Sequence, residues 1–317
     1  MSTPHDGTSD SAPNPFADSI KQRLFNRSRA SGETLNIFLV RFSVERLLYR
    51  LSKSAHANDF VLKGAVLFSI WADAPHRPTM DVDLLGFGDP SPENLTRVFQ
   101  NICGVSVQQD GLVFAPSSVV VEPIRADSMY DGLRVRLLAT LGKARIPMQI
   151  DVGFGDAIIP YAPTMQLPSL LDLPSAIMRT YPPETVIAEK LDAIVTLGMT
   201  NSRMKDYFDL WTLSCTMKFE FALLRQAATA TFQRRGTPWP SEMPAGLTNE
   251  FAQDSMKQIQ WAAFTRKLGK GNAAPSLSVV VTKLREFVWP LLEVQVLSNS
   301  DSMQWKPRGP WHASYFH

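Results

Sequence analysis

The chain has 317 residues, of which 44% are hydrophobic and 20% charged, with a formal net charge of +2 and a sequence pI of about 8.5. This composition predicts a globular protein of one large or two ordinary domains, and the charge is far weaker than that of a dedicated DNA-binding domain. No signal-peptide pattern is evident, no apolar run is long enough to predict a membrane span, and Cys103 and Cys215 lack metal-ligand spacing, so we expect a cytoplasmic protein with two reduced thiols.

The N-terminal part predicts a short tail followed by helices. Residues 1–15 are rich in Ser, Pro, Asp and Asn, which is typical of a flexible tail. Helical periodicity begins near Asp18. Between Leu35 and Leu51 the apolar residues recur mostly at three- and four-residue steps, which predicts an amphipathic helix that packs on the domain that follows.

A strand-to-helix turn comes next. Phe60-Val61-Leu62 predicts a short buried strand, Lys63-Gly64-Ala65 the turn, and the run from Val66 to Trp71 a helix. A glycine in such a turn lets the backbone approach a ligand closely, and the helix N-terminus offers N–H groups to a phosphate.

Two acids interrupt the apolar run Met80-Asp81-Val82-Asp83-Leu84-Leu85. In a strand, residues two apart point to the same face, so Asp81 and Asp83 project side by side while Val82 faces the core. Two close carboxylates repel each other and favour a bound cation, with Mg²⁺ the usual choice. An edge strand with two solvent-facing acids is an equally good reading of this stretch alone. The loop before it brings His76 and Arg77 close to the carboxylates.

The middle of the chain predicts one helix and three strands. The helix runs from Pro92 to Ile102 with Ser91 as N-cap, and the strands are Val119–Ile124, Leu133–Leu141 and Ile146–Phe154, with a hairpin at Gly142-Lys143. The last strand carries Asp151 among apolar residues. Gly-Phe-Gly-Asp occurs at residues 86–89 and again at 153–156, each time directly after an acid-bearing strand, and we interpret both as similar strand exits rather than as a repeat.

After Pro182-Pro183 the pattern becomes helical. The predicted helices are Glu184–Leu197 ended by Gly198, Arg203–Cys215 with Ser202 as N-cap, Phe219–Phe232, Thr248–Leu268, and Leu277–Val294 with Pro290 kinking or ending it. The predicted domains are a tail at 1–15, a mixed sheet domain with N-terminal helices at 16–165, a helical domain at 166–297 and a tail at 298–317.

The acids on apolar strands point to phosphoryl or nucleotidyl transfer. If Asp81, Asp83 and Asp151 converge at one sheet edge, they can hold two metal ions roughly 4 Å apart, which activate an attacking oxygen and stabilise a leaving phosphate. In the helical part, Lys190 could reach a triphosphate, and Asp206 is an acid on the next helix. Salt bridges between neighbouring helices are the commoner role of such residues.

Several segments in order resemble a known family. Lys63-Gly64-Ala65 and Arg77-Pro78-Thr79-Met80-Asp81-Val82-Asp83 resemble the signature of DNA polymerase β-like nucleotidyltransferases. The later segments are residues 148–156, Glu189-Lys190-Leu191-Asp192 and residues 203–210. Together with the first two, they resemble the AbiEii/AbiGii family of nucleotidyltransferase toxins of bacterial toxin–antitoxin and phage-defence systems. The resemblance covers roughly residues 35–290.

The resemblance implies an α+β fold, with a polymerase β-like mixed sheet domain followed by a helical domain. It makes Asp81 and Asp83 the ligands of Mg²⁺ or Mn²⁺, with Asp151 or Asp206 completing the metal site. Lys190 would bind the triphosphate and Asp206 would be the essential acid of the helical motif. Lys63, Gly64, Ala65 and Arg77 would bind the nucleotide, although the family turn usually reads Gly-Gly or Gly-Ser.

The substrates implied by the resemblance are an NTP and an RNA acceptor, in some members the 3′ end of tRNA, whose modification blocks translation. A cognate antitoxin is the implied protein partner. The basic residues Arg234, Arg235, Arg266, Lys267 and Lys270 are either an RNA path or a solvated basic face. Thr79, beside the acids, is either a modification target or a structural threonine.

Two alternatives remain open. The first is a polymerase β-like transferase that modifies a protein or a small molecule. An acidic cleft would favour a cationic small molecule, and a basic cleft would favour RNA. The second alternative is an inactive fold that acts by binding a partner, and the presence of Asp81, Asp83, Asp151, Lys190 and Asp206 argues against it.

Overall fold

The structure is a computed structural model that describes residues 14–71, 80–124, 132–268, 274–293 and 302–313. The described part holds ten α-helices: α1 (Pro15–Ser31), α2 (Leu35–Lys53), α3 (Phe68–Trp71), α4 (Pro92–Cys103), α5 (Pro183–Leu197), α6 (Met204–Thr216), α7 (Phe221–Arg235), α8 (Asn249–Gln253), α9 (Ser255–Thr265) and α10 (Leu277–Leu292). It also holds eleven strands: β1 (Phe60–Lys63), β2 (Asp81–Gly86), β3 (Leu112–Phe114), β4 (Val120–Pro123), β5 (Gly132–Leu141), β6 (Ala144–Phe154), β7 (Thr164–Gln166), β8 (Ile177–Arg179), β9 (Phe219–Glu220), β10 (Met303–Trp305) and β11 (Trp311–Ala313).

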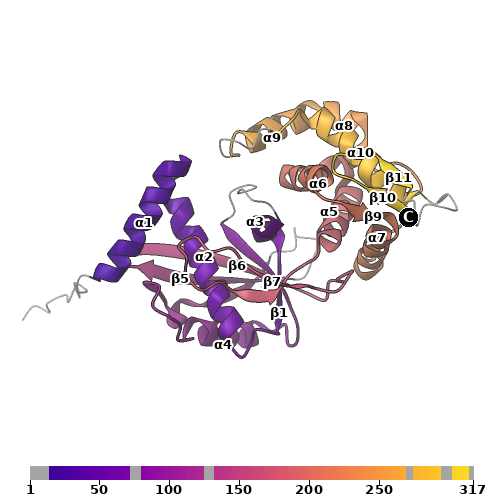
Figure 1. Ribbon diagram of the computed structural model, residues 1–317. Coiled ribbons are helices and arrows are strands. Elements are labelled where there is room, and N and C mark those ends of the chain that lie inside the picture. Colours follow the sequence, from indigo (N-terminus) through magenta and orange to yellow (C-terminus); the bar gives the residue numbers. More distant parts are fainter. Residues whose placement is uncertain (1–13, 72–79, 125–131, 269–273, 294–301, 314–317) are drawn as a thin grey trace, which may run out of the picture.

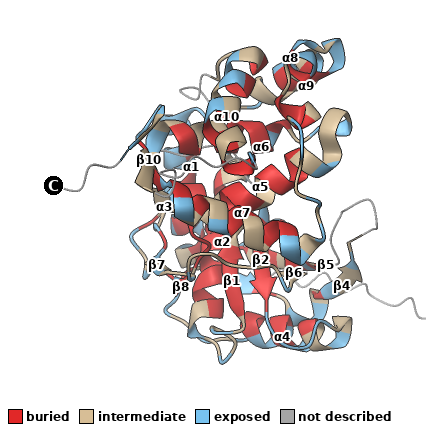
Figure 2. Ribbon diagram, turned by 90° about the vertical axis from the view of Figure 1, so that its right-hand side faces the viewer, coloured by how far each residue is buried: buried red, intermediate tan, exposed pale blue. Residues whose placement is uncertain are grey.

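The N-terminal half is built on a six-stranded mixed sheet in the order β1-β2-β6-β5-β3, with β4 also paired to β5. The β2–β6 pair is parallel and the other pairs are antiparallel. Helices α1 and α2 lie at one side of the sheet, and α5 to α10 gather at the other side (Figure 1). The predicted strands and the hairpin at Gly142-Lys143 are confirmed, and Figure 2 shows buried residues along β1 and β2 and through the neighbouring helices.

The sheet brings the two predicted acid-bearing strands together. In β2, Val82 and Leu84 are 0% and 1% exposed, so they point into the core, while Asp81 and Asp83 take the opposite face. In β6, Ile150 and Val152 are both 0% exposed and Asp151 lies between them. This alternation is the reason the strands present their acids on one side.

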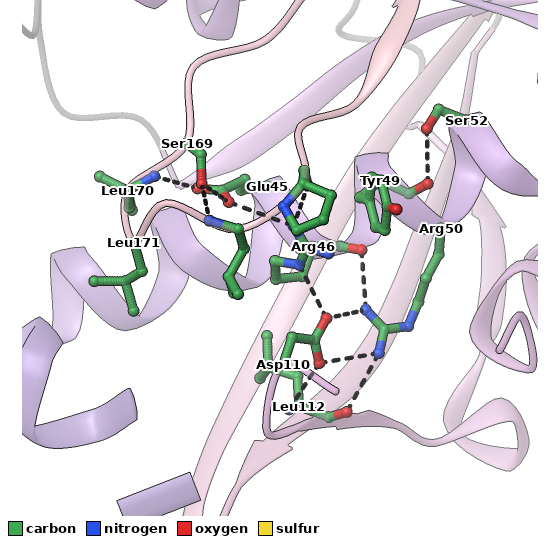
Figure 3. A network of polar contacts seen from close by, with 12 residues as sticks. Glu45, Arg46, Tyr49, Arg50, Ser52, Asp110, Leu112, Ser169, Leu170 and Leu171 are labelled. Atoms are coloured by element: carbon green, nitrogen blue, oxygen red, sulfur yellow. Dashed lines mark hydrogen bonds and ion pairs between the residues drawn. The ribbon is translucent and has the colours of Figure 1, made fainter. Parts of the chain in front are cut away.

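Helix α2 is fastened to the sheet domain by buried charges (Figure 3). Arg46 and Arg50 both donate to Asp110, at 2.9 and 2.7 Å, and all three side chains are at least 92% buried. Burial acts to raise the pKa of Asp110, but the hydrogen bonds and charges of Arg50 and Arg46 outweigh it and hold this pKa below its ordinary value. Glu45, the residue directly before Arg46, accepts from the hydroxyl of Ser169 and from the backbone N–H of Leu170, at 2.9 and 2.8 Å.

The helical part is completed by the end of the chain. Strands β10 and β11 form a three-stranded sheet with β9, and Trp305 on β10 is 0% exposed. Its indole Nε1 donates to the carbonyl of Ser214, in the last turn of α6, at 2.7 Å. The segment 303–313, placed in a C-terminal tail by the sequence, is therefore packed against the helices.

Several predicted boundaries were wrong in informative ways. The run from Val66 to Trp71 begins as a 3-10 helix at Gly64. Ser202 does not cap α6; instead the Asn201 side chain accepts from the backbone N–H of Arg203 at 2.9 Å. The predicted helix at Phe219 starts two residues later, because Phe219–Glu220 pair with β10.

The long helix predicted at 248–268 is two helices. The chain breaks at Asp254, whose side chain accepts from the backbone N–H of Lys257 at 2.9 Å and so starts α9. Helix α10 continues two residues past Pro290 before it ends. The predicted N-cap Ser91 is confirmed. Asn14 similarly caps α1, which begins at Pro15, three residues before the predicted start near Asp18.

Candidate active site

A cleft of about 640 Å³ lies between the sheet and helices α5, α6 and α7. Strands β1, β2, β6 and β5 supply one wall, and the helices supply the other. Its charged lining residues among those described are Lys63, Arg134, Lys190, Arg203, Lys205, Arg234 and Arg235 as cations, and Asp83, Asp151, Asp156, Glu189 and Asp206 as acids.

Four of these residues form one row across four neighbouring strands. Lys63 of β1 is paired in register with Asp83 of β2, Asp83 with Asp151 of β6, and Asp151 with Arg134 of β5. Residues paired in register project to the same face of a sheet. The cleft wall therefore carries a line of charges in the order cation, acid, acid, cation.

The acid pair of β2 lies in an environment that disfavours its ionised form. Burial raises the pKa of Asp83 above its ordinary value, although the charges of Lys63 and Lys205 act in the opposite direction. The pKa of Asp81 is also raised, by burial and then by the charge of Asp151. Like charges gathered in this way favour a counter-cation.

Asp151 is already engaged within this row. Arg134 donates to both of its carboxylate oxygens, from Nε and Nη2, at 2.8 Å each. This bidentate geometry is the strong form of an arginine–carboxylate pair. It holds the guanidinium of Arg134 in the cleft wall at the β5 end of the row.

The backbone of Gly64 lies against the side chain of Asp83. Its φ is +77°, and a Cβ built on it would lie 2.0 Å from Oδ2 of Asp83. Only glycine fits both this backbone conformation and this space. The predicted need for glycine in the turn thus has a definite cause, which is the carboxylate of Asp83.

Lys63, next to this glycine, belongs to a buried ionic cluster that joins the sheet to the helices. Its Nζ contacts Oδ2 of Asp156 at 2.9 Å and Oε1 of Glu189 on α5 at 3.5 Å. Arg235, at the end of α7, contacts Asp156, Glu189 and Asp192 at 3.2, 3.3 and 3.0 Å. Burial favours the neutral amine, but the charges of Glu189 and Asp156 raise the pKa of Lys63.

Lys190 and Asp206 face each other across the helical wall. Nζ of Lys190 on α5 lies 2.6 Å from Oδ1 of Asp206 and 2.9 Å from Oδ2 of Asp209, both on α6. The side chains of Asp206 and Asp209 are 7% and 1% exposed. Two buried acids therefore hold one lysine ammonium at the cleft wall.

The structure brings most of the predicted site residues into this one cleft. Lys63, Gly64, Ala65, Asp83, Asp151, Lys190 and Asp206 line it. Asp81 lies on the same face of β2 as Asp83 but is exposed and outside the cleft lining. The predicted residues His76, Arg77 and Thr79 lie outside the described residues, as does Lys270.

The residues of the site without a predicted role include Arg134, Asp156, Glu189 and Asp209, together with Arg203 and Lys205. The sequence signal for Asp156 was the second Gly-Phe-Gly-Asp stretch. The two stretches differ in the contacts of their aspartates: Asp89 accepts from the N–H and hydroxyl of Ser91, whereas Asp156 binds Lys63. Arg235, considered for an RNA path, has a side chain 6% exposed and held by three acids, so it belongs to the buried cluster instead.

Asp81 and Asp83 fit a divalent cation by the chemistry of their oxygens and by their raised pKa values. Among the described residues, no three His, Cys, Asp or Glu side chains are gathered as a ready metal-ligand set. Asp151 could join such a set if one of its oxygens left Arg134. The metal role of Asp81, Asp83 and Asp151 stays a prediction.

The sequence matches the family model described as "Nucleotidyl transferase AbiEii toxin, Type IV TA system" over residues 46–283. The matched range contains every cleft residue described above. The chain belongs to this AbiEii family. It is thus a nucleotidyltransferase toxin of a type IV toxin–antitoxin system, which implies an NTP substrate and an antitoxin partner.

The solved structure of a nucleotidyltransferase toxin supports the fold of this AbiEii-family chain. MenT4, a nucleotidyltransferase toxin from Mycobacterium tuberculosis H37Rv, is similar with a TM-score of 0.51 at 18% identity, over 84% of this chain and 87% of that one. JHP933 from Helicobacter pylori matches with a TM-score of 0.34 at 13% identity, over 78% of this chain and 92% of that one. A comparison with curated protein sequences gave no match.

The predicted α+β nucleotidyltransferase fold and family are therefore confirmed. Within the described residues, no helix has the length and apolar character that crossing a membrane requires.

Proposed function

We propose that this AbiEii-family enzyme transfers a nucleotide from an NTP to an RNA acceptor, the 3′ end of tRNA, and so blocks translation. The observation that carries the proposal is the row Lys63–Asp83–Asp151–Arg134, which faces Lys190 and Asp206 across one cleft. Charged groups fixed on both walls are what nucleotidyl transfer needs, because positioning and neutralisation supply most of its catalysis.

Within this proposal, each wall has a separate task. The turn at Gly64 and Ala65 lies against Asp83 and would receive the nucleotide phosphates by its backbone. Asp81 and Asp83 would hold Mg²⁺ or Mn²⁺, which would neutralise the departing pyrophosphate. The acceptor 3′ hydroxyl would bond to the α-phosphate, the bond to pyrophosphate would break, and the hydroxyl proton would be released beside the acid pair.

The helical wall would keep the nucleotide in place. Lys190 lines the cleft on α5, and Asp206 and Asp209 hold its ammonium, so this lysine would keep α5 and α6 in place around the nucleotide. Asp206 is then essential because it holds this lysine. The ionic cluster around Asp156, Glu189 and Arg235 would set the position of Lys63 at the far end of the row.

The charge of the cleft supports an anionic acceptor. Among its described lining residues, seven are Lys or Arg and five are Asp or Glu, so the cleft is not the acidic one that a cationic small molecule would require. Arg266 and Lys267, at the end of α9, are exposed and add positive charge on the helical part. A tRNA acceptor also places the reaction in the cytoplasm.

The test is a transfer assay with purified protein, Mg²⁺, total tRNA and each labelled NTP in turn, beside an Asp81→Ala control. Label that reaches RNA with the intact enzyme alone would support the proposal and identify the nucleotide. Label on the protein itself would show that the acceptor is a protein and not RNA. Equal labelling of RNA by the Asp81→Ala variant would show that Asp81 has no role in the transfer.

A further inference from the structure

The cations of the cleft divide into two groups by their partners. Arg134 is held by Asp151, Lys190 by Asp206 and Asp209, and Lys63 and Arg235 by the ionic cluster around Asp156. Arg234 donates to the backbone carbonyl of Gly155. These cations are committed to groups of the protein itself.

Arg203 and Lys205 form the second group. Both line the cleft, and neither side chain is in ion-pair contact with an acid in the part of the chain that the structure describes. Arg203 is half-buried and Lys205 is exposed. An arginine at a cleft wall without a carboxylate keeps its donors available for an anion that arrives with a ligand.

The chain fixes both residues at the start of α6. The buried side chain of Asn201 accepts from the backbone N–H of Arg203 at 2.9 Å, which sets the turn before the helix. Lys205 lies in the first turn and precedes Asp206, which points to Lys190 at 2.6 Å. Arg203 and Lys205 are therefore held by the backbone that also orients the Lys190 pair.

Lys205, in the first turn of α6, lines the same cleft as Asp83 of β2. A phosphate chain whose reacting end lies at the acid pair would thus have its other phosphates directed toward the start of α6. The volume of the cleft, about 640 Å³, is that of a site for a small ligand.

We propose that Arg203 and Lys205 hold the β- and γ-phosphates of the NTP, and that Lys190 instead bridges α5 and α6 through Asp206 and Asp209. The inference rests on the proposed function, since it takes the nucleotide to lie between β2 and α6. We assign these residues to the phosphates of the NTP rather than to those of RNA because both residues line the cleft rather than the outer face of the helices.

The experiment is a binding measurement without RNA. The intact enzyme and the variants Arg203→Gln and Lys205→Gln are titrated with each of the four NTPs and the four nucleoside monophosphates in the presence of Mg²⁺. Each variant should weaken NTP affinity at least about tenfold, because a hydrogen bond from a charged donor is lost. Monophosphate affinity should stay within about twofold, because the monophosphate lacks the groups that these residues would contact.

Two controls make the result specific. Lys218→Gln removes an exposed lysine two residues past the end of α6, outside the cleft lining, and should leave NTP affinity unchanged. Lys205→Arg keeps the charge and should restore most of the affinity. Thermal unfolding of each variant within about 2 °C of the intact protein would show that the fold is kept.

The outcomes separate this inference from the proposed acceptor. NTP affinity unchanged in both glutamine variants would overturn the inference, and reduced tRNA binding in the same variants would assign the residues to RNA. Weakened NTP binding without transfer to any RNA would leave the inference standing and overturn the RNA acceptor. Failure of the intact enzyme to bind any NTP would overturn both.

Discussion

Asp83 lies directly opposite Asp151 across the parallel pair β2–β6, and each is flanked by a cation on its outer side, Lys63 and Arg134. Because the four side chains project from neighbouring strands to one sheet face, substitution of each one measures its own contribution to metal binding and transfer. The predictions below separate the acids, the glycine that touches them, and the ionic contacts that hold the walls together.

Asp83→Asn should weaken Mn²⁺ binding more than Asp151→Asn. Both oxygens of Asp151 are taken by Arg134 at 2.8 Å, whereas no arginine of the described residues is paired with Asp83. Removing a direct ligand should cost at least about tenfold in metal affinity, since even loss of a ligand's hydrogen-bonding partner costs that much. Mn²⁺ titration followed by electron paramagnetic resonance measures this. Equal losses in the two variants would make Asp151 a full ligand.

Gly64→Ala should abolish most transfer activity and lower stability. The new Cβ would fall 2.0 Å from Oδ2 of Asp83, and the φ of +77° adds strain of about 1–3 kcal/mol for a residue with a side chain. Gly32→Ala is the matched control, because Gly32 has φ +73° but open space around its Cβ position. Denaturant unfolding should show lower stability in both variants. The transfer assay should show lost activity in Gly64→Ala and unchanged activity in Gly32→Ala.

Arg235→Met should destabilise the protein by about 3–5 kcal/mol, because the acids Asp156, Glu189 and Asp192, whose side chains are 13%, 19% and 0% exposed, lose a shared cation. Glu122→Gln serves for comparison. It breaks an ion pair with Arg136 whose side chains are 42% and 53% exposed, and should cost at most about 1 kcal/mol. Urea unfolding of both variants gives the two numbers, and similar values would show that the buried cluster contributes little.

Asp110 should make the protein sensitive to acid. Because its arginine partners lower its folded-state pKa, its ionisation stabilises the fold above the unfolded pKa of about 3.9, and this contribution is lost as pH falls toward the lower folded value. In Asp110→Asn, unfolding free energy should be lower near neutral pH and should fall less steeply below about pH 4. Urea unfolding at a series of pH values measures both slopes. If unfolding free energy falls equally steeply with pH in the intact protein and in Asp110→Asn, Asp110 does not contribute to acid unfolding.

The sequence predicted those parts of the site that depend on residues close together in the chain. The spacing of Asp81 and Asp83 within apolar neighbours defines a strand with one acidic face, and the glycine before α3 predicts a close backbone approach. The predicted strand at Asp151 pairs with β2 in register, so the convergence of the acids follows from the sheet. The family resemblance added Lys190 and Asp206, which local patterns had left open to a surface salt bridge.

What the sequence could not predict depends on contacts between distant segments. Lys63 and Asp156 are 93 residues apart, and Arg235 and Asp156 are 79 apart, so neither pair leaves a periodic signal. For the same reason β9 was predicted as the start of a helix, since its partner β10 is more than 80 residues downstream. Arg134 lies in a predicted strand, and nothing in the pattern of that strand marked it as a residue of the site.

The contact between Trp305 and Ser214 has a consequence for the order of events during synthesis. Helix α6 carries Asp206 near its start, and its last turn is held by the indole of Trp305 and by the backbone N–H of Arg308, which also donates to the carbonyl of Ser214 at 2.9 Å. A ribosome must add about ninety further residues after α6 before this support exists. The helical wall of the cleft therefore reaches its final form only after residues 305–308 have been synthesised, and a shorter nascent chain lacks this support for the helix that carries Asp206.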